Sequence, residues 1–186
     1  MIVALTGQKG GVGKSTLAIC IASELLARRH KVLLVDADPQ GTVRTWGEVA
    51  AEAGQPQPSI VAMGSTMHRP EQLPTVRQGY DDVVIDCPPR HGDIQRSALM
   101  VADMAILPCG PSSADAWALA ARIDLMKTEV GYRVAFAESL GAGQGVTTYA
   151  PKDVAAEETR ALVSEMLLWE KTLAPAVAPP APARRR

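Results

Sequence analysis

The sequence is poor in aromatic residues and has no long apolar run. Phe, Trp and Tyr make up 4% of the 186 residues, whereas hydrophobic residues as a whole make up 47%. This balance suits one domain with a parallel sheet whose aliphatic strands are covered by helices on both faces. No apolar run approaches the 18 residues of a membrane-spanning helix, and no charged-then-apolar leader opens the chain. We therefore expect a cytoplasmic protein without stable membrane insertion.

The three cysteines are too few and too far apart to form a disulfide framework or a metal centre. Cys20, Cys87 and Cys109 show no metal-ligand spacing. Cys20 falls within an expected helix, where it is interpreted as core filler. Cys87 follows an aspartate at the end of an expected strand, so it could lie near a bound ligand, although a reactive or ligand role is the less favoured interpretation.

Acidic residues are absent from the C-terminal segment, residues 172–186, which ends in three arginines. The whole chain has a formal net charge of −1, and without this segment 16 basic and 20 acidic residues remain. Residues 1–171 are thus not a strongly basic nucleic-acid binder. The Pro/Ala-rich segment cannot build a core, so we expect an extended, mobile tail beside a domain of residues 1–171. Its arginines, Arg184 to Arg186, either contact phosphates of DNA or lipid or are simply solvated.

Strand and helix patterns alternate along the chain, which predicts an α/β fold with a mostly parallel sheet flanked by helices. Continuous apolar runs predict strands, and longer amphipathic stretches predict helices. The expected strands are residues 2–5, 32–35, 60–63, 83–85 and 104–107. The expected helices are residues 15–29, 42–53, 70–78 and 94–101, and a helix from Ser112 or Ser113 to about Glu129.

A glycine-rich turn lies between the first expected strand and the first expected helix. Residues 7–16 read Gly-Gln-Lys-Gly-Gly-Val-Gly-Lys-Ser-Thr. In this setting backbone N–H groups and the helix N-terminus can hold a phosphate chain, Lys14 can reach its β- and γ-phosphates, and the Ser15 hydroxyl can ligate Mg²⁺. The general P-loop pattern has a glycine where this chain has Gln8, and a second lysine, Lys9, follows. The expected phosphate cradle comprises Gly10, Gly11, Val12, Gly13, Lys14, Ser15 and Thr16.

Carboxylates end two of the expected strands. Asp36 and Asp38 close the second strand, and residues two apart on an extended segment face the same side. At the carboxyl end of a parallel strand, that side faces the ligand crevice. Alternatively, both residues simply begin the turn before Pro39. Asp86 ends the fourth strand, and a buried aspartate there needs a cation or a donor as partner.

Three of these motifs together resemble the ParA/MinD family of deviant Walker-A ATPases. They are the Lys-Gly-Gly-Val-Gly-Lys-Ser stretch of residues 9–15, Asp-Ala-Asp-Pro-Gln at residues 36–40, and Val-Ile-Asp-Cys-Pro-Pro at residues 84–89. The last two are most similar to the ParA branch, and the resemblance covers about residues 1–170. It implies a three-layer P-loop NTPase-like fold that binds ATP or ADP with Mg²⁺.

The resemblance also implies roles for single residues. Lys9 would reach across a dimer to the partner's ATP, like an arginine finger supplied in trans, although a contact within its own subunit or a surface position remains open. With Lys14, it would be a catalytic residue. Asp38 would orient the attacking water and join the magnesium shell with Ser15 and Asp86. Asp36 would support the P-loop and that shell.

The sequence departs from the family after about Val130. Roughly thirty residues that contribute a sheet edge and much of the adenine pocket in relatives have no counterpart, so we expect a shortened sheet edge. Arg133 heads a segment that resembles the family's interface near the partner nucleotide, with a surface arginine as the alternative. Lys152 is the other basic candidate.

The implied function is an ATP-dependent dimeric switch that binds DNA without sequence preference and partitions or positions a plasmid, chromosome or protein cargo. A ParB-like or other adaptor would stimulate its hydrolysis, and it would be associated with the nucleoid. One alternative is a membrane-associated positioning ATPase of the MinD branch, for which residues 161–171 would have to be a membrane-binding helix. A relative of the nitrogenase iron protein is disfavoured by the scattered cysteines. A catalytically impaired nucleotide-binding interaction module is the third alternative.

Overall fold

The computed structural model describes residues 1–110 and 124–172. In these ranges it contains one sheet of five strands in the order β3-β2-β4-β1-β5, and all four neighbouring pairs are parallel. The strands are β1 (Ile2–Leu5), β2 (Val32–Asp36), β3 (Ser59–Ala62), β4 (Asp82–Asp86) and β5 (Met104–Ile106). All five strands expected from the sequence are therefore present.

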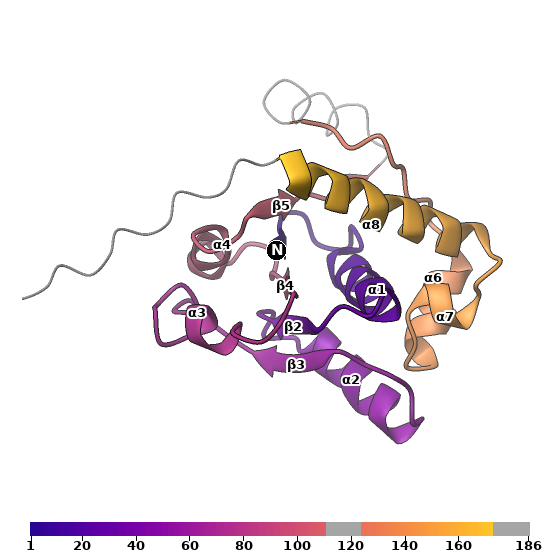
Figure 1. Ribbon diagram of the computed structural model, residues 1–186, viewed down its shortest axis with the longest axis horizontal. Helices are drawn as coiled ribbons and strands as arrows, with labels where there is room; N and C mark the ends of the chain where they lie inside the picture. The colour runs from indigo at the N-terminus through magenta and orange to yellow at the C-terminus, as the bar shows by residue number, and fades with distance from the viewer. Residues whose placement is uncertain (111–123, 173–186) are drawn as a thin grey trace, which may run out of the picture.

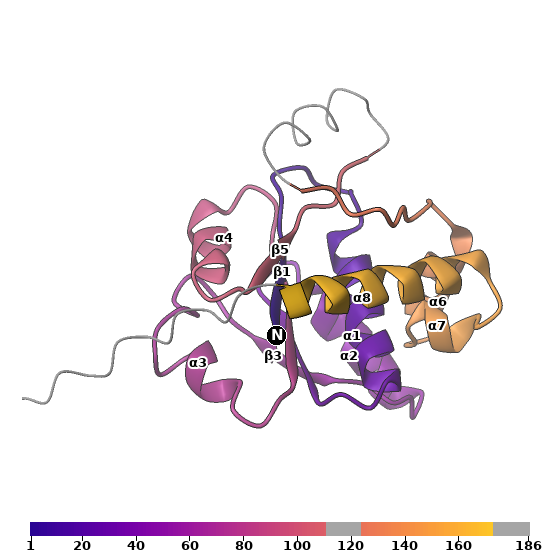
Figure 2. The ribbon, with the colours of Figure 1, turned by 45° about the horizontal axis from the view of Figure 1, so that its top comes forward.

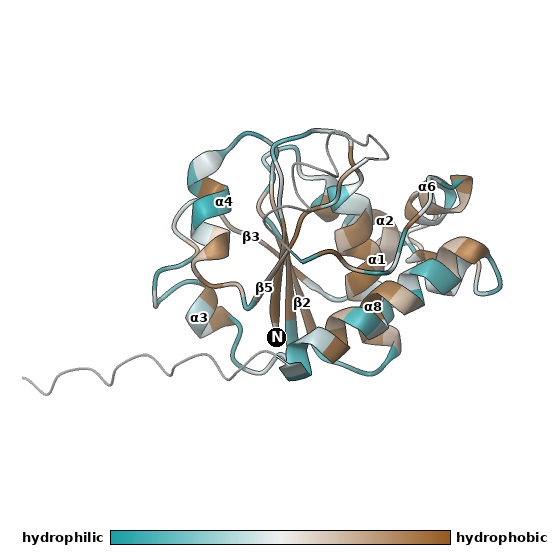
Figure 3. Ribbon diagram, turned by 90° about the horizontal axis from the view of Figure 1, so that it is seen from above, coloured by the Kyte–Doolittle hydropathy of each residue, from teal (hydrophilic) through white to brown (hydrophobic). Residues whose placement is uncertain are grey.

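Helices cover both faces of the sheet and form the two outer layers. Helices α3 (Leu73–Val76) and α4 (Gly92–Leu99) lie on one face. Helices α1 (Lys14–Ala27), α2 (Thr42–Glu52), α6 (Val134–Gly141), α7 (Val146–Tyr149) and α8 (Val154–Thr172) lie on the other (Figures 1 and 3). The four helices expected before residue 102 are all found, although α3 is limited to four residues of the expected stretch 70–78.

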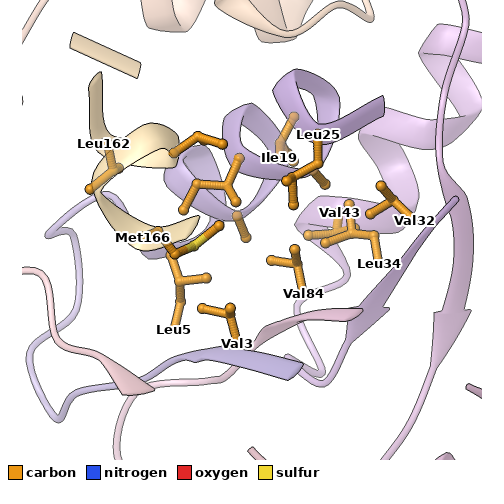
Figure 4. Close-up of a cluster of buried hydrophobic side chains, with 14 of the residues drawn as sticks. Val3, Leu5, Ile19, Leu25, Val32, Leu34, Val43, Val84, Leu162 and Met166 are labelled. Atoms are coloured by element: carbon orange, nitrogen blue, oxygen red, sulfur yellow. The ribbon is translucent and has the colours of Figure 1, made fainter. Parts of the chain in front are cut away.

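Alternation along the strands divides the core into two clusters, because successive side chains of a strand point to opposite faces. Val3, Leu5 and Leu34 belong to the cluster beneath α1, α2 and α8 (Figure 4). Ile2 and Leu33 belong to the cluster on the α3 and α4 face. Every residue of β1, β2 and β4 is buried, as expected for the central strands of a two-sided parallel sheet.

The C-terminal helix α8 is an integral part of the core. Leu162, Val163 and Met166 are buried in the cluster beneath α1, and α8 runs across α1 in both ribbon views (Figures 1 and 2). Trp169 packs against the same cluster. The apolar side of this helix is therefore occupied by the protein's own core.

The helix expected from Ser112 or Ser113 to about Glu129 is wrong in its second part, which begins at residue 124 in the described chain. Residues 124–130 are not helical. The backbone N–H groups of Lys127 and Thr128 donate to the carboxylate of Glu165 in α8, at 2.7 and 2.9 Å, instead of to carbonyls one turn earlier. Met126 and Val130 pack against the core cluster. Tertiary contacts with α8 thus outweigh the local helical pattern. The start of this expected helix and residues 173–186 of the expected tail lie outside the described residues.

Candidate functional site

The glycine-rich turn joins β1 to α1 at the carboxyl edge of the sheet. Gly11 and Gly13 have φ values of 74° and 85°, in the left-handed region that favours glycine. Gly13 is the N-cap of α1, which begins at Lys14. The first N–H groups of a helix have no partner within the helix, so this end of α1 can donate to an anion. The expected cradle of residues 10–16 therefore has the strand–turn–helix setting that phosphate binding requires.

Lys14 is buried at the base of this turn. Only 6% of the residue is exposed, and its Nζ donates to the backbone carbonyl of Lys9 at 2.9 Å. The ammonium group is thus directed into the turn rather than toward bulk solvent. The side chain of Lys9 belongs to an exposed residue of the same turn. Its expected role in trans concerns a second subunit and stays a prediction.

The carboxylates of Asp36, the last residue of β2, and of Asp38 each accept from a backbone N–H two residues further along the chain. Asp36 Oδ1 accepts from the backbone N–H of Asp38 at 3.1 Å. Asp38 Oδ1 in turn accepts from the backbone N–H of Gln40 at 2.9 Å. Such short-range bonds fix both side chains on a tight turn. Both the expected support role of Asp36 and the alternative of a simple turn residue agree with this geometry.

Asp86 is the buried carboxylate of the site. It ends β4 and is level with the ends of both neighbouring strands, because it is the register partner of Leu5 in β1 and of Asp36 in β2. The residue is 0% exposed. Within residues 1–110 and 124–172, neither carboxylate oxygen has a hydrogen-bond partner within the usual geometric limits. A fully buried carboxylate with no partner is costly, so this group is suited to a cation.

The electrostatics of Asp86 follow from this burial. Desolvation raises its pKa from 3.8 to about 7, and the negative charges of Asp36 and Asp38 add to the increase. The neighbouring Ser15 hydroxyl and the Lys14 ammonium act in the opposite direction. The three aspartates, Ser15 and Lys14 therefore share one electrostatic environment. A cation there would favour the charged carboxylate.

The donor set fits Mg²⁺ bound together with phosphates. Mg²⁺ prefers oxygen ligands and usually takes one or two carboxylates, waters and substrate phosphates instead of a complete protein cage. Ser15 and Asp86 supply a hydroxyl and a carboxylate at this position. In residues 1–110 and 124–172, no group of three or more His, Cys, Asp or Glu residues could hold a metal ion by itself.

Two of the cysteines, Cys20 and Cys87, are buried. Cys87 is 1% exposed, and burial raises the pKa of its thiol to about 12. At neutral pH it is therefore a neutral thiol that packs in the core on the α4 face. Cys20 is buried as expected, with its pKa also raised to about 12 by burial.

Arg133 and Lys152 are placed differently. Arg133 precedes α6, and its guanidinium forms an ion pair with Glu158 of α8. Hydrogen bonding from Arg133 lowers the pKa of Glu158. The pair fastens the chain before α6 to α8, which is an intramolecular structural role. Lys152 is exposed between α7 and α8.

Sequence reasoning missed two residues that support the site. Arg44, in the first turn of α2, donates to Asp36 Oδ2 through its backbone N–H at 3.0 Å and through Nε at 3.2 Å. An arginine eight residues after a strand-ending aspartate, at a helix start, was the available signal. Gln95, in the first turn of α4, donates to backbone carbonyls of two loops of the site. No sequence pattern pointed to it.

Comparison with known proteins agrees with this geometry. The model of the CobQ/CobB/MinD/ParA nucleotide binding domain matches residues 3–146. The chain is 38% identical over 120 residues to the maintenance of carboxysome distribution protein A of Gloeobacter kilaueensis, which covers 61% of this chain and 51% of that relative. It is 33% identical over 132 residues to the chromosome-partitioning ATPase Soj of Thermus thermophilus, with 57% and 53% covered. The chain thus spans about half the length of these curated relatives.

The fold is also that of a solved structure. The septum site-determining protein MinD complexed with Mg-ADP, from Pyrococcus horikoshii, aligns with a TM-score of 0.68 and 17% identity. The alignment covers 93% of this chain and 98% of that one. The expected P-loop NTPase-like fold and the resemblance to ParA/MinD proteins are both confirmed.

Proposed function

The chain belongs to the CobQ/CobB/MinD/ParA nucleotide-binding family, and we propose that it is an ATPase of the ParA type. In this proposal it binds ATP and Mg²⁺ at residues 10–16, dimerises with ATP, and binds DNA without sequence preference to position a cargo. The single observation that carries the nucleotide assignment is the buried, unpartnered carboxylate of Asp86, level with the glycine-rich turn. In the proposed site, the Asp86 carboxylate would bind the cation and the Lys14 ammonium would bind the phosphates.

Each residue has a role that follows from its place. Lys14 and the N–H groups at the start of α1 hold the phosphates and neutralise their charge. Ser15 and Asp86, with Asp38 nearby, would hold Mg²⁺, which supplies further charge neutralisation on the β- and γ-phosphates when bound. Asp38 would accept a hydrogen bond from the attacking water and so orient it, while its Oδ1 accepts from the backbone N–H of Gln40. Asp36, fixed by Arg44, keeps the Asp38 turn in place.

Three features of the proposal concern partners. Lys9 would complete the site of the second subunit. The tail 173–186 would add three arginines to basic patches that dimerisation brings together, since paired weak sites gain affinity through avidity. The names of the two relatives suggest two cargo classes, a chromosome and a protein assembly such as a carboxysome, and a plasmid is a third candidate. An adaptor of the ParB kind would accelerate hydrolysis, and the protein would be found on the nucleoid.

The MinD-like membrane role has less support. It needs an amphipathic helix with an apolar side available to lipid, but Leu162 and Met166 of α8 are 4% and 0% exposed. No helix in residues 1–110 and 124–172 is long and apolar enough to cross a membrane. The catalytically impaired module differs from the ATPase only in turnover, so kinetics separate the two.

Calorimetry with Mg-ADP tests the nucleotide site. We expect Lys14→Ala to abolish detectable binding, because the lysine is the cation of the cradle. Lys31→Ala is the matched control, since Lys31 precedes β2 at the opposite edge of the sheet and is exposed. Equal affinity of Lys14→Ala and the parent protein would contradict the assignment.

Retention of a random-sequence DNA duplex on a filter tests the proposed DNA binding. We expect retention with ATP that weakens steeply with salt, because each neutralised phosphate contributes a slope of about −0.9 in log K against log salt. Deleting residues 173–186 should lower that slope if the tail takes part. Absence of binding in every nucleotide state at low salt would overturn the DNA assignment, and binding to anionic lipid vesicles would then favour the membrane role.

A further inference from the structure

The side chain of Gln95 connects two loops of the candidate site. Its Nε2 donates to the carbonyl of Pro88 at 2.7 Å and to the carbonyl of Gly7 at 3.3 Å. Pro88 follows Asp86 by two residues, and Gly7 opens the glycine-rich turn. The bond to Gly7 joins elements that are 88 positions apart in the sequence, whereas Pro88 lies seven residues before Gln95 in the loop that leads into α4. One amide group of α4 therefore holds the loop after β4 against the loop after β1.

The loop after β4, residues 88–91, is held from the same helix at a second point. His91 Nδ1 lies 2.9 Å from the carbonyl of Pro89, and the N–H of Gln95 donates to the carbonyl of His91. Pro89 also faces the glycine-rich turn, because a Cβ added to Gly10 would lie 4.0 Å from Pro89 Cγ. Arg90 has a φ of 61°, a conformation that non-glycine residues adopt only when the surroundings hold them there.

We propose that Gln95 is a positioning residue that couples the 88–91 loop to the glycine-rich turn, so that phosphate bound in the turn orders this loop and the start of α4. The proposal rests on the proposed nucleotide-binding function. Among the described residues, the Gln95 side chain donates to two carbonyl oxygens, whereas the cradle would bind phosphate through N–H groups and Lys14. Its loss therefore leaves nucleotide affinity nearly unchanged and impairs the step that needs the 88–91 loop in place.

Gln95→Met is the variant that tests this, because methionine has similar length and no N–H donor. Gln78→Met is the matched control, because Gln78 is an exposed glutamine in the turn that follows α3. Backbone amide hydrogen exchange is measured on both variants and the parent protein, without nucleotide and with Mg-ADP. Steady-state ATP hydrolysis gives kcat and KM separately. Gln95→Glu, which also cannot donate, replaces Gln95→Met if thermal melts show that the latter does not fold.

The expected exchange result has two parts. Without nucleotide, residues 87–92 exchange faster in Gln95→Met than in the parent protein, because two restraining bonds are gone. With Mg-ADP, protection of residues 8–16 rises in both proteins, but protection of residues 87–92 rises only in the parent. In kinetics, kcat falls about tenfold and KM stays within about twofold, the size expected for one or two hydrogen bonds used only in the chemical step.

Identical exchange of residues 87–92 in the two proteins, with and without nucleotide, overturns the coupling. So does a rise in KM with unchanged kcat. A parent protein that shows no protection by Mg-ADP contradicts the nucleotide site itself. The nucleotide-free comparison still decides whether Gln95 holds the loop, so the two failures are distinguishable.

Discussion

At the scale of single residues, the account depends on Asp86. A carboxylate that is fully buried, level with two neighbouring strand ends and without a hydrogen-bond partner destabilises the folded protein whenever it is charged. Such a group persists where function needs it, and the nearby Ser15 and Lys14 indicate which function. The cost of Asp86 in the nucleotide-free protein is measurable through pH.

We predict that stability without Mg²⁺ falls as pH rises from about 4 to 7. Asp86 has a folded-state pKa near 7 and an unfolded value near 3.8, so the folded protein holds the extra proton in this window. The free energy of unfolding therefore decreases with rising pH, by at most about 4 kcal/mol, and the loss is complete above pH 7. The Asp86→Asn variant lacks the titrating carboxyl group, so this pH-dependent loss of stability should be absent from it.

Urea unfolding at pH 5 and pH 8 measures the effect. We expect Asp86→Asn to be more stable than the parent protein at pH 8, with a smaller difference at pH 5. Glu71→Gln, at an exposed position, is the control for losing one negative charge. Parent and Asp86→Asn curves that differ equally at both pH values would contradict the raised pKa.

A second residue-scale prediction separates binding from chemistry. Asp38→Ala should bind Mg-ATP within about threefold of the parent protein but hydrolyse it at least about a hundredfold more slowly, because positioning of water matters only in the chemical step. Calorimetry and phosphate release measure the two properties. Asp124→Ala, which removes an exposed carboxylate, should change neither. Normal turnover in Asp38→Ala would assign the water to another residue.

At the scale of elements, strands were predictable and helix docking was not. The buried strands of a parallel sheet are continuous aliphatic runs, so all five could be recognised from composition and spacing. The glycine-rich turn and the strand-ending aspartates were predictable for the same reason, since topology brings parallel strand ends to one edge. The 124–130 segment was mispredicted because its N–H groups bind Glu165, a partner 37 or 38 residues away. Arg44 lies only eight residues after its partner Asp36, so a sequence signal for it was available, whereas the bond from Gln95 to the carbonyl of Gly7 is defined only by the fold.

The turn between α6 and α7 carries an element-scale prediction. Gly143 has a φ of 66°, and a Cβ added there would lie 2.6 Å from Cα of Ala50 in α2. Gly143→Ala must therefore shift the α6–α7 unit away from α2, and we expect it to lower the free energy of unfolding by about 2–3 kcal/mol. Gly64→Ala is the matched control, because no atom lies within 4 Å of an added Cβ. Chemical denaturation decides, and equal stability of the two variants would be inconsistent with this packing.

At the scale of the whole molecule, the described chain has the fold of the CobQ/CobB/MinD/ParA nucleotide-binding family, and its sequence alignments span about half the length of its curated relatives. Its sheet has β5 at one edge and β3 at the other, and α8 closes the core over α1. The residues of the candidate phosphate cradle and the three aspartates beside it all come from one chain. The proposed second subunit, which would contribute Lys9, is what converts a binding site into a switch.

Light scattering of the Asp38→Ala protein tests this central claim most directly, because we expect that variant to bind ATP and to hydrolyse it only slowly. We predict the monomer mass of 19.7 kDa with Mg-ADP and twice that mass with Mg-ATP. Adding Lys9→Ala should return the Mg-ATP sample to the monomer mass, whereas adding Lys171→Ala at the end of α8 should leave the dimer intact. A mass that is the same with Mg-ADP and Mg-ATP would contradict the account.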